Sequence, residues 1–260
     1  MKTTKSPDGT TIGWKTSGNG QQLLLVHGTT ADHRRWEGIT SRLEEDFAVH
    51  AMDRRGRGTS TDGPQYDLLR EAEDIAAVVD ALGGTVSILA HSYGAVCSLE
   101  AALLTDNLRR LVLYEPPIPT GIPMYPPGSP ERIDELVAAG DSEGALEVFF
   151  REVVEMPDSE LVRYRQLPMW AERIKLAPTI ARELAIDRRY TFEQPKFTGF
   201  DIPTTLLLGS ESPPMFSSAA ALVSEAVSTA EVVELPGQRH IAMDTDPDLF
   251  LEVVTSRLAA

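Results

Sequence analysis

The sequence contains a single cysteine, Cys97, so no disulfide can form within the chain. Proteins without disulfides are typical of the reducing cytoplasm, and we expect this location. No apolar run approaches the roughly 20 residues that a membrane-spanning helix needs. The first residues, from Met1 to Gly9, are polar and do not resemble an apolar signal segment. We therefore expect no membrane partner.

Basic residues are few, because 24 lysines and arginines stand against 39 aspartates and glutamates, for a net charge of −15. A surface of that sign repels the phosphates of nucleic acids, so we expect no nucleic-acid partner. The histidine and cysteine spacings of zinc sites are absent, and no glycine-rich dinucleotide motif follows a predicted strand. The sequence predicts neither a metal nor a cofactor.

Apolar and β-branched runs typical of buried strands recur along the chain and alternate with helical periodicities. The predicted strands cover residues 10–16, 22–26, 47–52, 85–90, 111–114, 204–209 and 230–235. Strands that alternate with helices predict an α/β protein with a doubly wound, mostly parallel sheet.

This alternation stops after Glu115. From residue 118 to 200 the sequence has proline-rich loops and amphipathic helices, predicted at 136–154, 161–169 and 174–184, but no strand. We therefore expect a core formed by residues 1–117 and 201–260, and a helical cap inserted at 118–200. Such an insertion is expected above the carboxyl ends of the strands, where doubly wound folds bind ligands.

Between Thr85 and Leu99 the pattern changes from a strand-like run to small residues at helical spacing. Ser92 lies at the apex of this sharp turn, which strains the backbone and raises the side chain clear of the sheet edge. Ala90 and Gly94 are small enough for the strand and the helix to pass closely. The pattern favours a nucleophilic serine, although the motif alone also fits an ordinary strand-to-helix turn.

A serine hydroxyl needs an imidazole to remove its proton, and we expect His240, after the last predicted strand, to be this base. The oxyanion that forms needs main-chain N–H donors, which we expect from Tyr93 and Thr29. The residues expected to contact the substrate are Gly28, Thr30, Trp36, Met124 and Trp170.

Together these segments resemble the α/β-hydrolase superfamily. The matching segments are 27–28, 53–60, 90–94, 236–237 and His240, which span the chain apart from the insertion. The resemblance implies a serine hydrolase with a helical cap and without a cofactor. It also implies that the loop 53–60 is structural and held by Asp53 and Arg54, although its glycines and arginines could suggest a phosphate site.

The acidic partner of His240 remains open between two glutamates. Most of the superfamily has an aspartate where this sequence has Ser212, which cannot hold an imidazolium ion. Glu211 stands one residue earlier, whereas Glu115 ends the strand after the elbow helix, a position that resembles the acid of haloalkane dehalogenases and fungal zearalenone lactonases. A strand end is more rigid than a loop, so we favour Glu115 over Glu211.

The resemblance implies hydrolysis of a carboxylic ester or lactone of a fairly apolar small molecule through an acyl-enzyme on Ser92. A C–C bond hydrolase or a cofactor-free perhydrolase would use the same three side chains. A receptor that binds a small ligand with little turnover is a third class, which the intact Ser92, His240 and acid disfavour. The expected partner is a small-molecule ester or lactone, and the sequence leaves a homodimer open.

Overall fold

A computed structural model of the chain describes residues 1–187 and 189–259. It contains an eight-stranded sheet in the order β1-β2-β4-β3-β5-β6-β7-β8. β1 and β2 pair antiparallel with their neighbours, and all later strands pair parallel. The strands are β1 (Lys2–Lys5), β2 (Thr11–Ser17), β3 (Gln21–Val26), β4 (Phe47–Met52), β5 (Val86–His91), β6 (Leu108–Tyr114), β7 (Thr204–Gly209) and β8 (Ala230–Leu235). The predicted doubly wound, mostly parallel sheet is confirmed.

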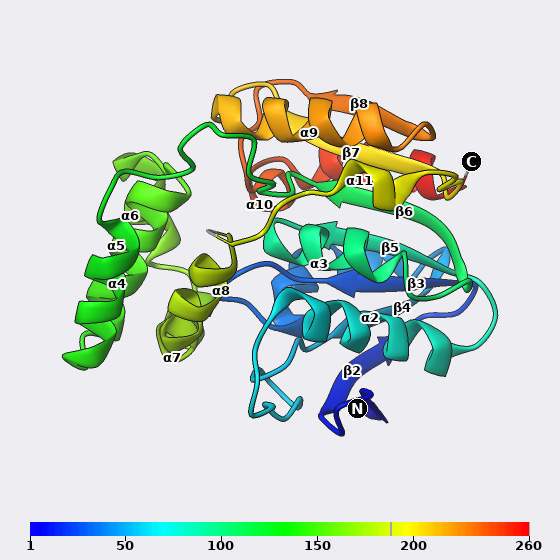
Figure 1. Cartoon of the computed structure of the whole chain (residues 1–260), viewed down its shortest axis with the longest axis horizontal. Helices are drawn as coiled ribbons and strands as arrows, with labels where there is room; N and C mark the ends of the chain where they lie inside the picture. The colour runs from blue at the N-terminus through cyan, green and yellow to red at the C-terminus, as the bar shows by residue number, and fades with distance from the viewer. Residues whose placement is uncertain (188, 260) are drawn as a thin grey trace.

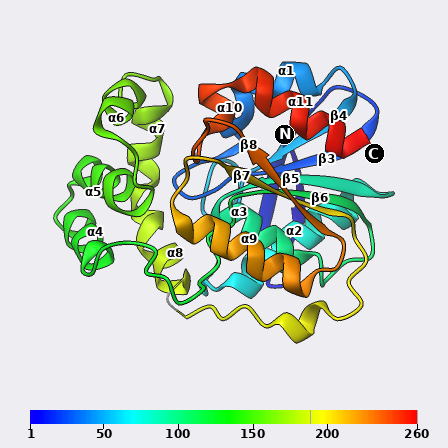
Figure 2. The same cartoon turned by 90° about the horizontal axis from the view of Figure 1, so that it is seen from above.

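Helices cover both faces of the sheet (Figure 2). One face carries α1 (Glu37–Leu43), α10 (Ala242–Thr245) and α11 (Pro247–Ala259), and the other carries α2 (Leu68–Leu82), α3 (Tyr93–Ala101) and α9 (Pro214–Ala226). Every residue of β4 and β5 is buried as a result. This explains why the central strands read as continuous apolar runs in the sequence.

Between β6 and β7 the chain leaves the sheet and forms further helices within residues 118–200, the insertion. They are α4 (Ser129–Ala138), α5 (Ser142–Val148), α6 (Asp158–Tyr164), α7 (Met169–Leu176) and α8 (Ile180–Asp187). Figure 1 shows α4 to α7 beyond one end of the sheet. Among the described residues, no helix is both long and apolar enough to cross a bilayer.

The insertion differs in detail from the predicted helices. The helix predicted at 136–154 is divided, because Gly140, with a φ of +81°, follows the end of α4. Asp141 then caps α5 by accepting a hydrogen bond from the Gly144 N–H at 2.9 Å. The segment predicted as a helix at 161–169 contains the end of α6 and a break at Pro168. The short edge strand β1 escaped prediction because its side chains are polar and it pairs only with β2.

Candidate active site

Ser92 connects the end of β5 to the first residue of α3. Its φ of +56° lies in the left-handed region that non-glycine residues seldom adopt. Two glycines permit the tight packing here. A Cβ atom on Gly94 would lie 2.3 Å from the His27 carbonyl oxygen, and one on Gly28 would lie 2.9 Å from the Ser92 Cβ. The raised serine therefore depends on glycine at both positions.

His240 lies in the loop after β8, and its Nδ1 is 2.6 Å from Oε2 of Glu115. The side chain of Glu115 is 0% exposed and that of His240 is 9% exposed. The other oxygen of Glu115, Oε1, accepts a hydrogen bond from the Gly209 N–H at 2.7 Å. A carboxylate at Nδ1 keeps the proton on that nitrogen and leaves Nε2 free to accept another.

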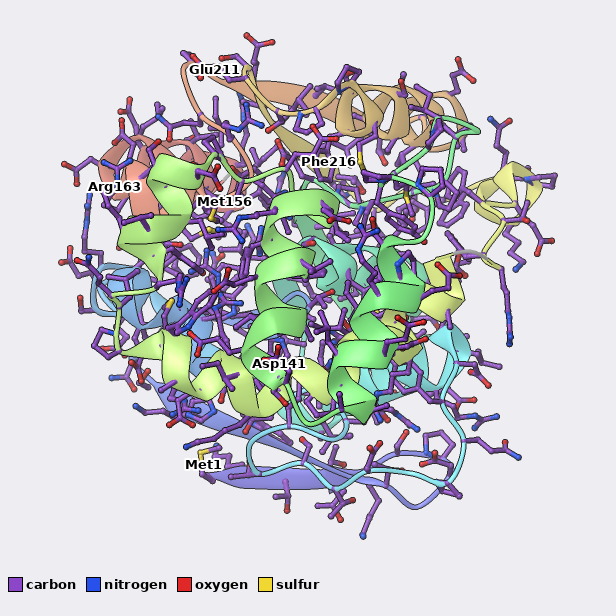
Figure 3. The ribbon with its side chains drawn as sticks, turned by 90° about the vertical axis from the view of Figure 1, so that its left-hand side faces the viewer. Met1, Asp141, Met156, Arg163, Glu211 and Phe216 are labelled. Carbon is purple, nitrogen blue, oxygen red and sulfur yellow. The ribbon has the colours of Figure 1, made fainter. Side chains whose placement is uncertain are left out.

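The alternative acid, Glu211, is placed differently. Its side chain is exposed, at the upper edge of the molecule in Figure 3. Among the described residues, Glu115 is the acid whose carboxylate contacts His240. The geometry therefore brings Glu115, and not Glu211, to the imidazole.

Two side chains hold the loop that carries His240. The Tyr114 hydroxyl donates to the Arg239 carbonyl and accepts from the Ala242 N–H at 3.0 Å. His91 Nε2 donates to the His240 carbonyl at 2.8 Å. Burial, together with the neighbouring His240, lowers the pKa of His91 well below its usual value, so His91 is a neutral donor. His91 therefore braces the loop beside the site.

The plane of the His240 ring is fixed by its neighbours. It stacks on Phe216 with 4.7 Å between ring centroids and 17° between planes. The His91 ring lies 4.6 Å away on centroids. These contacts, with the bond to Glu115, define where Nε2 points.

Thr29 and Tyr93 both border the space beside Ser92. Among the described residues, neither main-chain N–H donates to a protein acceptor. Tyr93 begins α3, where the first N–H groups of a helix have no partner within it. Both N–H groups are therefore free to stabilise a developing oxyanion.

Ser92 and His240 lie between two small cavities of about 30 Å³ each. The insertion contributes Phe149 and Val154 to both walls. The first cavity also contacts Gly28, Arg35, Phe150, Tyr164 and Arg173. The second also contacts Tyr93, Met124, Leu184, Met215 and Phe216. Each cavity has room for about two water molecules, so only small groups fit on either side of the serine.

Three residues expected to contact the substrate lie elsewhere. Trp36 is fully buried in the core beside α1. Trp170 packs in an aromatic cluster of the insertion, with its Nε1 donating to Glu143. The hydroxyl of Thr30 accepts a hydrogen bond from Arg173 and does not line either small cavity. Aromatic residues at helical spacing fill cores as well as pockets, and the local pattern did not separate the two roles.

Sequence reasoning missed Tyr114 and Arg173. Tyr114 ends a buried strand directly before Glu115, and nothing in the strand pattern marks its hydroxyl. Arg173 follows Met169 and Trp170 by four and three residues on α7, so it occupies an apolar face of an amphipathic helix. An arginine at such a position is a sequence signal that could have identified it.

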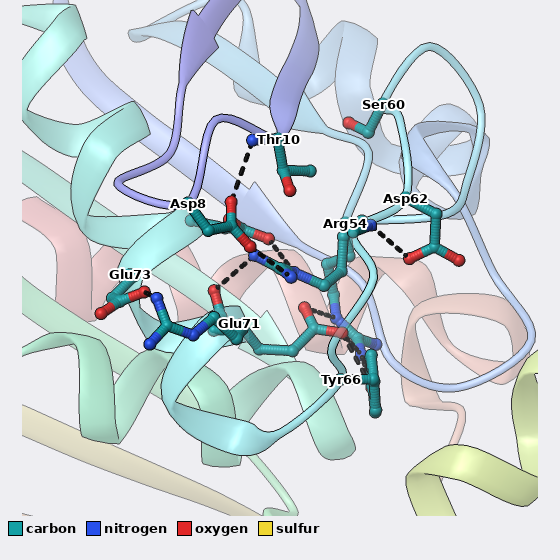
Figure 4. Close-up of polar contacts among 12 residues, drawn as sticks. Asp8, Thr10, Arg54, Ser60, Asp62, Tyr66, Glu71 and Glu73 are labelled. Carbon is teal, nitrogen blue, oxygen red and sulfur yellow. Dashed lines mark hydrogen bonds and ion pairs between the residues drawn. The ribbon is translucent and has the colours of Figure 1, made fainter.

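The arginine-rich loop 53–60 is paired with carboxylates (Figure 4). Arg54 Nη2 lies 2.7 Å from Glu71 Oε1 and 2.6 Å from Glu183 Oε1. Arg55 Nε lies 2.7 Å from Asp74 Oδ2. These guanidinium groups already have anionic partners, which confirms the structural role expected for the loop.

Asp32, His33 and Asp53 place one potential metal-ligating atom each within 4.8 Å of the others. Their carboxylates already have partners, since His33 Nδ1 lies 2.8 Å from Asp53 Oδ1 and Arg34 donates to both oxygens of Asp32. The cluster is explained by these bonds without a metal ion.

A model of the alpha/beta hydrolase family matches residues 23–253 of the chain. Among solved structures, an alpha/beta hydrolase from Sphaerobacter thermophilus is 33% identical, with a TM-score of 0.86. That alignment covers 99% of this chain and 100% of the other.

Two curated proteins are also similar. The 2-(acetamidomethylene)succinate hydrolase of Mesorhizobium japonicum is 26% identical in an alignment 267 positions long, which covers 96% of this chain and 92% of the relative. The N-formylmaleamate deformylase of Pseudomonas putida is 37% identical over 124 residues, and this alignment spans 46% of each chain, about half of the relative's length.

Proposed function

This chain is a hydrolase of the alpha/beta hydrolase family, and from that premise we propose that it cleaves a carboxylic ester or lactone of a fairly apolar small molecule through an acyl-enzyme on Ser92. The observation that carries the proposal is the 2.6 Å contact between His240 Nδ1 and Glu115, beside the cavities that His240 shares with the strained Ser92.

In the proposed reaction, Ser92 Oγ attacks the carbonyl carbon while its proton passes to His240 Nε2. The carbonyl π electrons move to the oxygen, which accepts hydrogen bonds from the Thr29 and Tyr93 N–H groups. The bond to the leaving oxygen then breaks as Nε2 returns the proton to that oxygen. Water releases the acyl group by the same steps, with His240 first accepting its proton. Glu115 holds the ring and stabilises the imidazolium throughout.

The walls support a small and fairly apolar substrate, since Phe149 and Val154 border both sides of the serine. A serine nucleophile also favours acyl transfer over the dehalogenase chemistry of this fold, which uses an aspartate at that position. We place the enzyme in the cytoplasm, which agrees with Cys97 being a free, buried thiol.

Hydrolysis of an amide is a second candidate, because one of the similar proteins is named a deformylase. The acyl-enzyme route is the same, with a nitrogen in place of the leaving oxygen. Matched ester and amide substrates with one acyl group separate the two candidates by their kcat/KM values.

A fluorophosphonate probe tests the proposal directly, because it forms a bond to an activated serine oxygen and releases fluoride. Mass spectrometry of peptides should locate the adduct on Ser92. The Ser92→Ala variant should take up no probe, should lose ester turnover by at least about 1,000-fold, and should keep its unfolding transition.

Ser212→Ala is the matched control, since Ser212 lies in the loop where most of the superfamily has its acid. It should be labelled like the wild type. An adduct on a different residue, or a Ser92→Ala variant that retains activity, would show that another group is the nucleophile.

A further inference from the structure

Arg173 differs from the other buried arginines of the structure. The residues described as buried include five arginines: Arg35, Arg54, Arg55, Arg57 and Arg173. The first four each form an ion pair with at least one aspartate or glutamate. Among the described residues, no carboxylate pairs with Arg173. A buried charge without a counter-ion is costly, so a position of this kind needs an explanation.

The hydrogen bonds of Arg173 use only one of its nitrogens, while its guanidinium carbon lies 5.5 Å from the Phe150 ring centroid and 5.3 Å from that of Tyr164. Nη1 donates to the carbonyl of Thr30 at 3.0 Å and to its hydroxyl at 2.7 Å. Nε is buried without a partner, and Nη2 has no acceptor among the described residues. Nε and Nη2 form the edge of a guanidinium that presents two parallel N–H donors. Such an edge matches the two oxygens of one carboxylate.

Arg173 borders the first cavity beside Ser92 and His240. The other charged side chain of that wall is Arg35, and no acidic residue lines the cavity within the described part of the chain. Arg35 is balanced by Asp244, whose Oδ2 lies 2.8 Å from its Nη2. The wall therefore offers a molecule bound at the serine one guanidinium that has no ion-pair partner among the described residues, since Asp32 and Asp244 act on it only from a greater distance.

The two arginines also border a second space. Ala31, Arg35 and Arg173 line both the first cavity and a larger neighbouring cleft of about 640 Å³. The wall of this cleft carries carboxylates as well, from Asp32, Glu37, Glu172 and Asp244. Among the described residues, the wall without an acidic side chain is therefore that of the first cavity, beside Ser92.

We propose that the substrate carries a carboxylate, which the free edge of Arg173 binds while Ser92 attacks the ester or lactone carbonyl. This inference rests on the proposed function and names its substrate class. The carboxylate lies in the first cavity, on the Arg173 side of the serine. The remainder of the molecule contacts the apolar walls formed by Phe149 and Val154.

Arg173 also supports Thr30, whose φ is +57°, in the loop that supplies the Thr29 N–H. If Arg173 had a purely structural role, its replacement would lower kcat/KM by the same factor for all substrates. Binding of a carboxylate predicts a loss that depends on the charge of the substrate. The experiment must therefore compare a charged ester with a neutral ester of the same shape.

Monoethyl succinate and ethyl 4-oxopentanoate form such a pair, because a methyl ketone replaces the carboxylate. Their hydrolysis is followed by acid release at constant pH. The wild type should prefer monoethyl succinate. Arg173→Gln, which can still donate to Thr30, should lower kcat/KM for this ester by about 10- to 100-fold, the usual effect of losing a charged hydrogen bond. The loss for ethyl 4-oxopentanoate, which reports only the support of the Thr30 loop, should be several-fold smaller, and Arg173→Lys should recover part of the preference.

Thr30→Ala is the matched control, because it removes the hydroxyl that Arg173 holds and leaves the guanidinium in place. It should affect both esters by the same factor. Equal losses for both esters in Arg173→Gln, or a wild type that prefers the neutral ester, would overturn the inference and assign Arg173 to support of the loop.

A binding measurement keeps the inference separate from catalysis. Calorimetry with the Ser92→Ala variant should detect succinate but not succinamide, and Ser92→Ala/Arg173→Gln should bind neither. If succinate fails to bind, the carboxylate site is wrong even where the fluorophosphonate labels Ser92. If succinate binds but Ser92 is not labelled, the carboxylate site stands and the proposed hydrolysis fails.

Discussion

Glu115 combines full burial with a φ of +48°, a conformation that a glutamate seldom adopts. The strain is sustained by three fixed contacts. Its N–H donates to the Leu207 carbonyl at 3.1 Å, and its two carboxylate oxygens contact the Gly209 N–H and His240 Nδ1. Strained residues of this kind are typical of functional sites.

Glu115→Gln should lower kcat by about 100- to 10,000-fold, because the amide can present its N–H₂ to Nδ1 and so favour the wrong tautomer of His240. Glu211→Gln should change kcat by less than about twofold, since the exposed Glu211 side chain does not contact the imidazole. Steady-state kinetics with one ester compare the two variants. The reverse ranking would reassign the acid to Glu211.

His50 offers a test of pH dependence away from the site. It is 3% exposed and contacts Thr16 and Gln22. Burial lowers the pKa of His50 from 6.5 to about 4. Its folded pKa lies below the unfolded value, so the unfolded chain binds more protons between these values. This contribution to stability is complete above pH 6.5 and is lost as the pH falls toward 4.

Wild-type protein should therefore lose about 1–2 kcal/mol of unfolding free energy through His50 between about pH 7.5 and about pH 5. His50→Gln lacks this contribution. The change in its unfolding free energy between the two pH values should therefore be smaller by that amount. Urea unfolding at both values measures it. If the unfolding free energies of wild type and His50→Gln changed equally between the two pH values, the pKa of His50 would not be lowered in the folded protein.

At the scale of elements, α8 is tied to the core through Glu183. Glu183 Oε1 lies 2.6 Å from Arg54 Nη2 and also contacts Arg57. Burial raises the pKa of Glu183, but the charges of Arg54 and Arg57 outweigh it and lower the pKa to about 2. The side chain of Thr29 also lowers this pKa. Glu183 on the insertion is therefore coupled electrostatically to the loop whose Thr29 N–H is the proposed oxyanion donor.

Glu183→Gln should lower the free energy of unfolding by about 3–5 kcal/mol, because it leaves two buried guanidinium groups with one fewer counter-charge. Glu172→Gln on α7 is the control. Glu172 is 35% exposed and pairs with Arg34, so its loss should cost less than about 1 kcal/mol. Urea unfolding measures the free energy of unfolding of both variants. Equal values would mean that the ion pairs of Glu183 stabilise the fold no more than a surface ion pair does.

At the scale of the whole molecule, the sequence predicts what local patterns encode. The sheet follows from apolar runs such as 22–26, the insertion from their interruption after Glu115, and the elbow from small residues around Ser92. The contact between Glu115 and His240 joins residues 125 positions apart. It could be predicted only because both residues follow strands whose carboxyl ends meet at one edge of the sheet.

Other features depend on distant partners without such a rule. The sequence places Arg173 on the apolar face of an inserted helix, but it does not show that Arg173 will have no carboxylate partner, because possible partners come from distant parts of the chain. Trp36 and Trp170 were expected at the substrate, but the core and the insertion bury them elsewhere. No local pattern states which side of a helix will face a cavity, because the packing of the insertion on the core decides it.

Because Glu115 at the end of β6 contacts His240, the segment after β7 does not have to supply an acid. The Gly209 N–H at its start donates to Glu115, and the Ser210 hydroxyl accepts from the Gly237 N–H in the loop that carries His240. Protein engineers can therefore treat the exposed side chain of Glu211 as a site for substitution or labelling, provided Gly209 and Ser210 are kept. In relatives that carry their acid in this segment, the same alterations would destroy turnover.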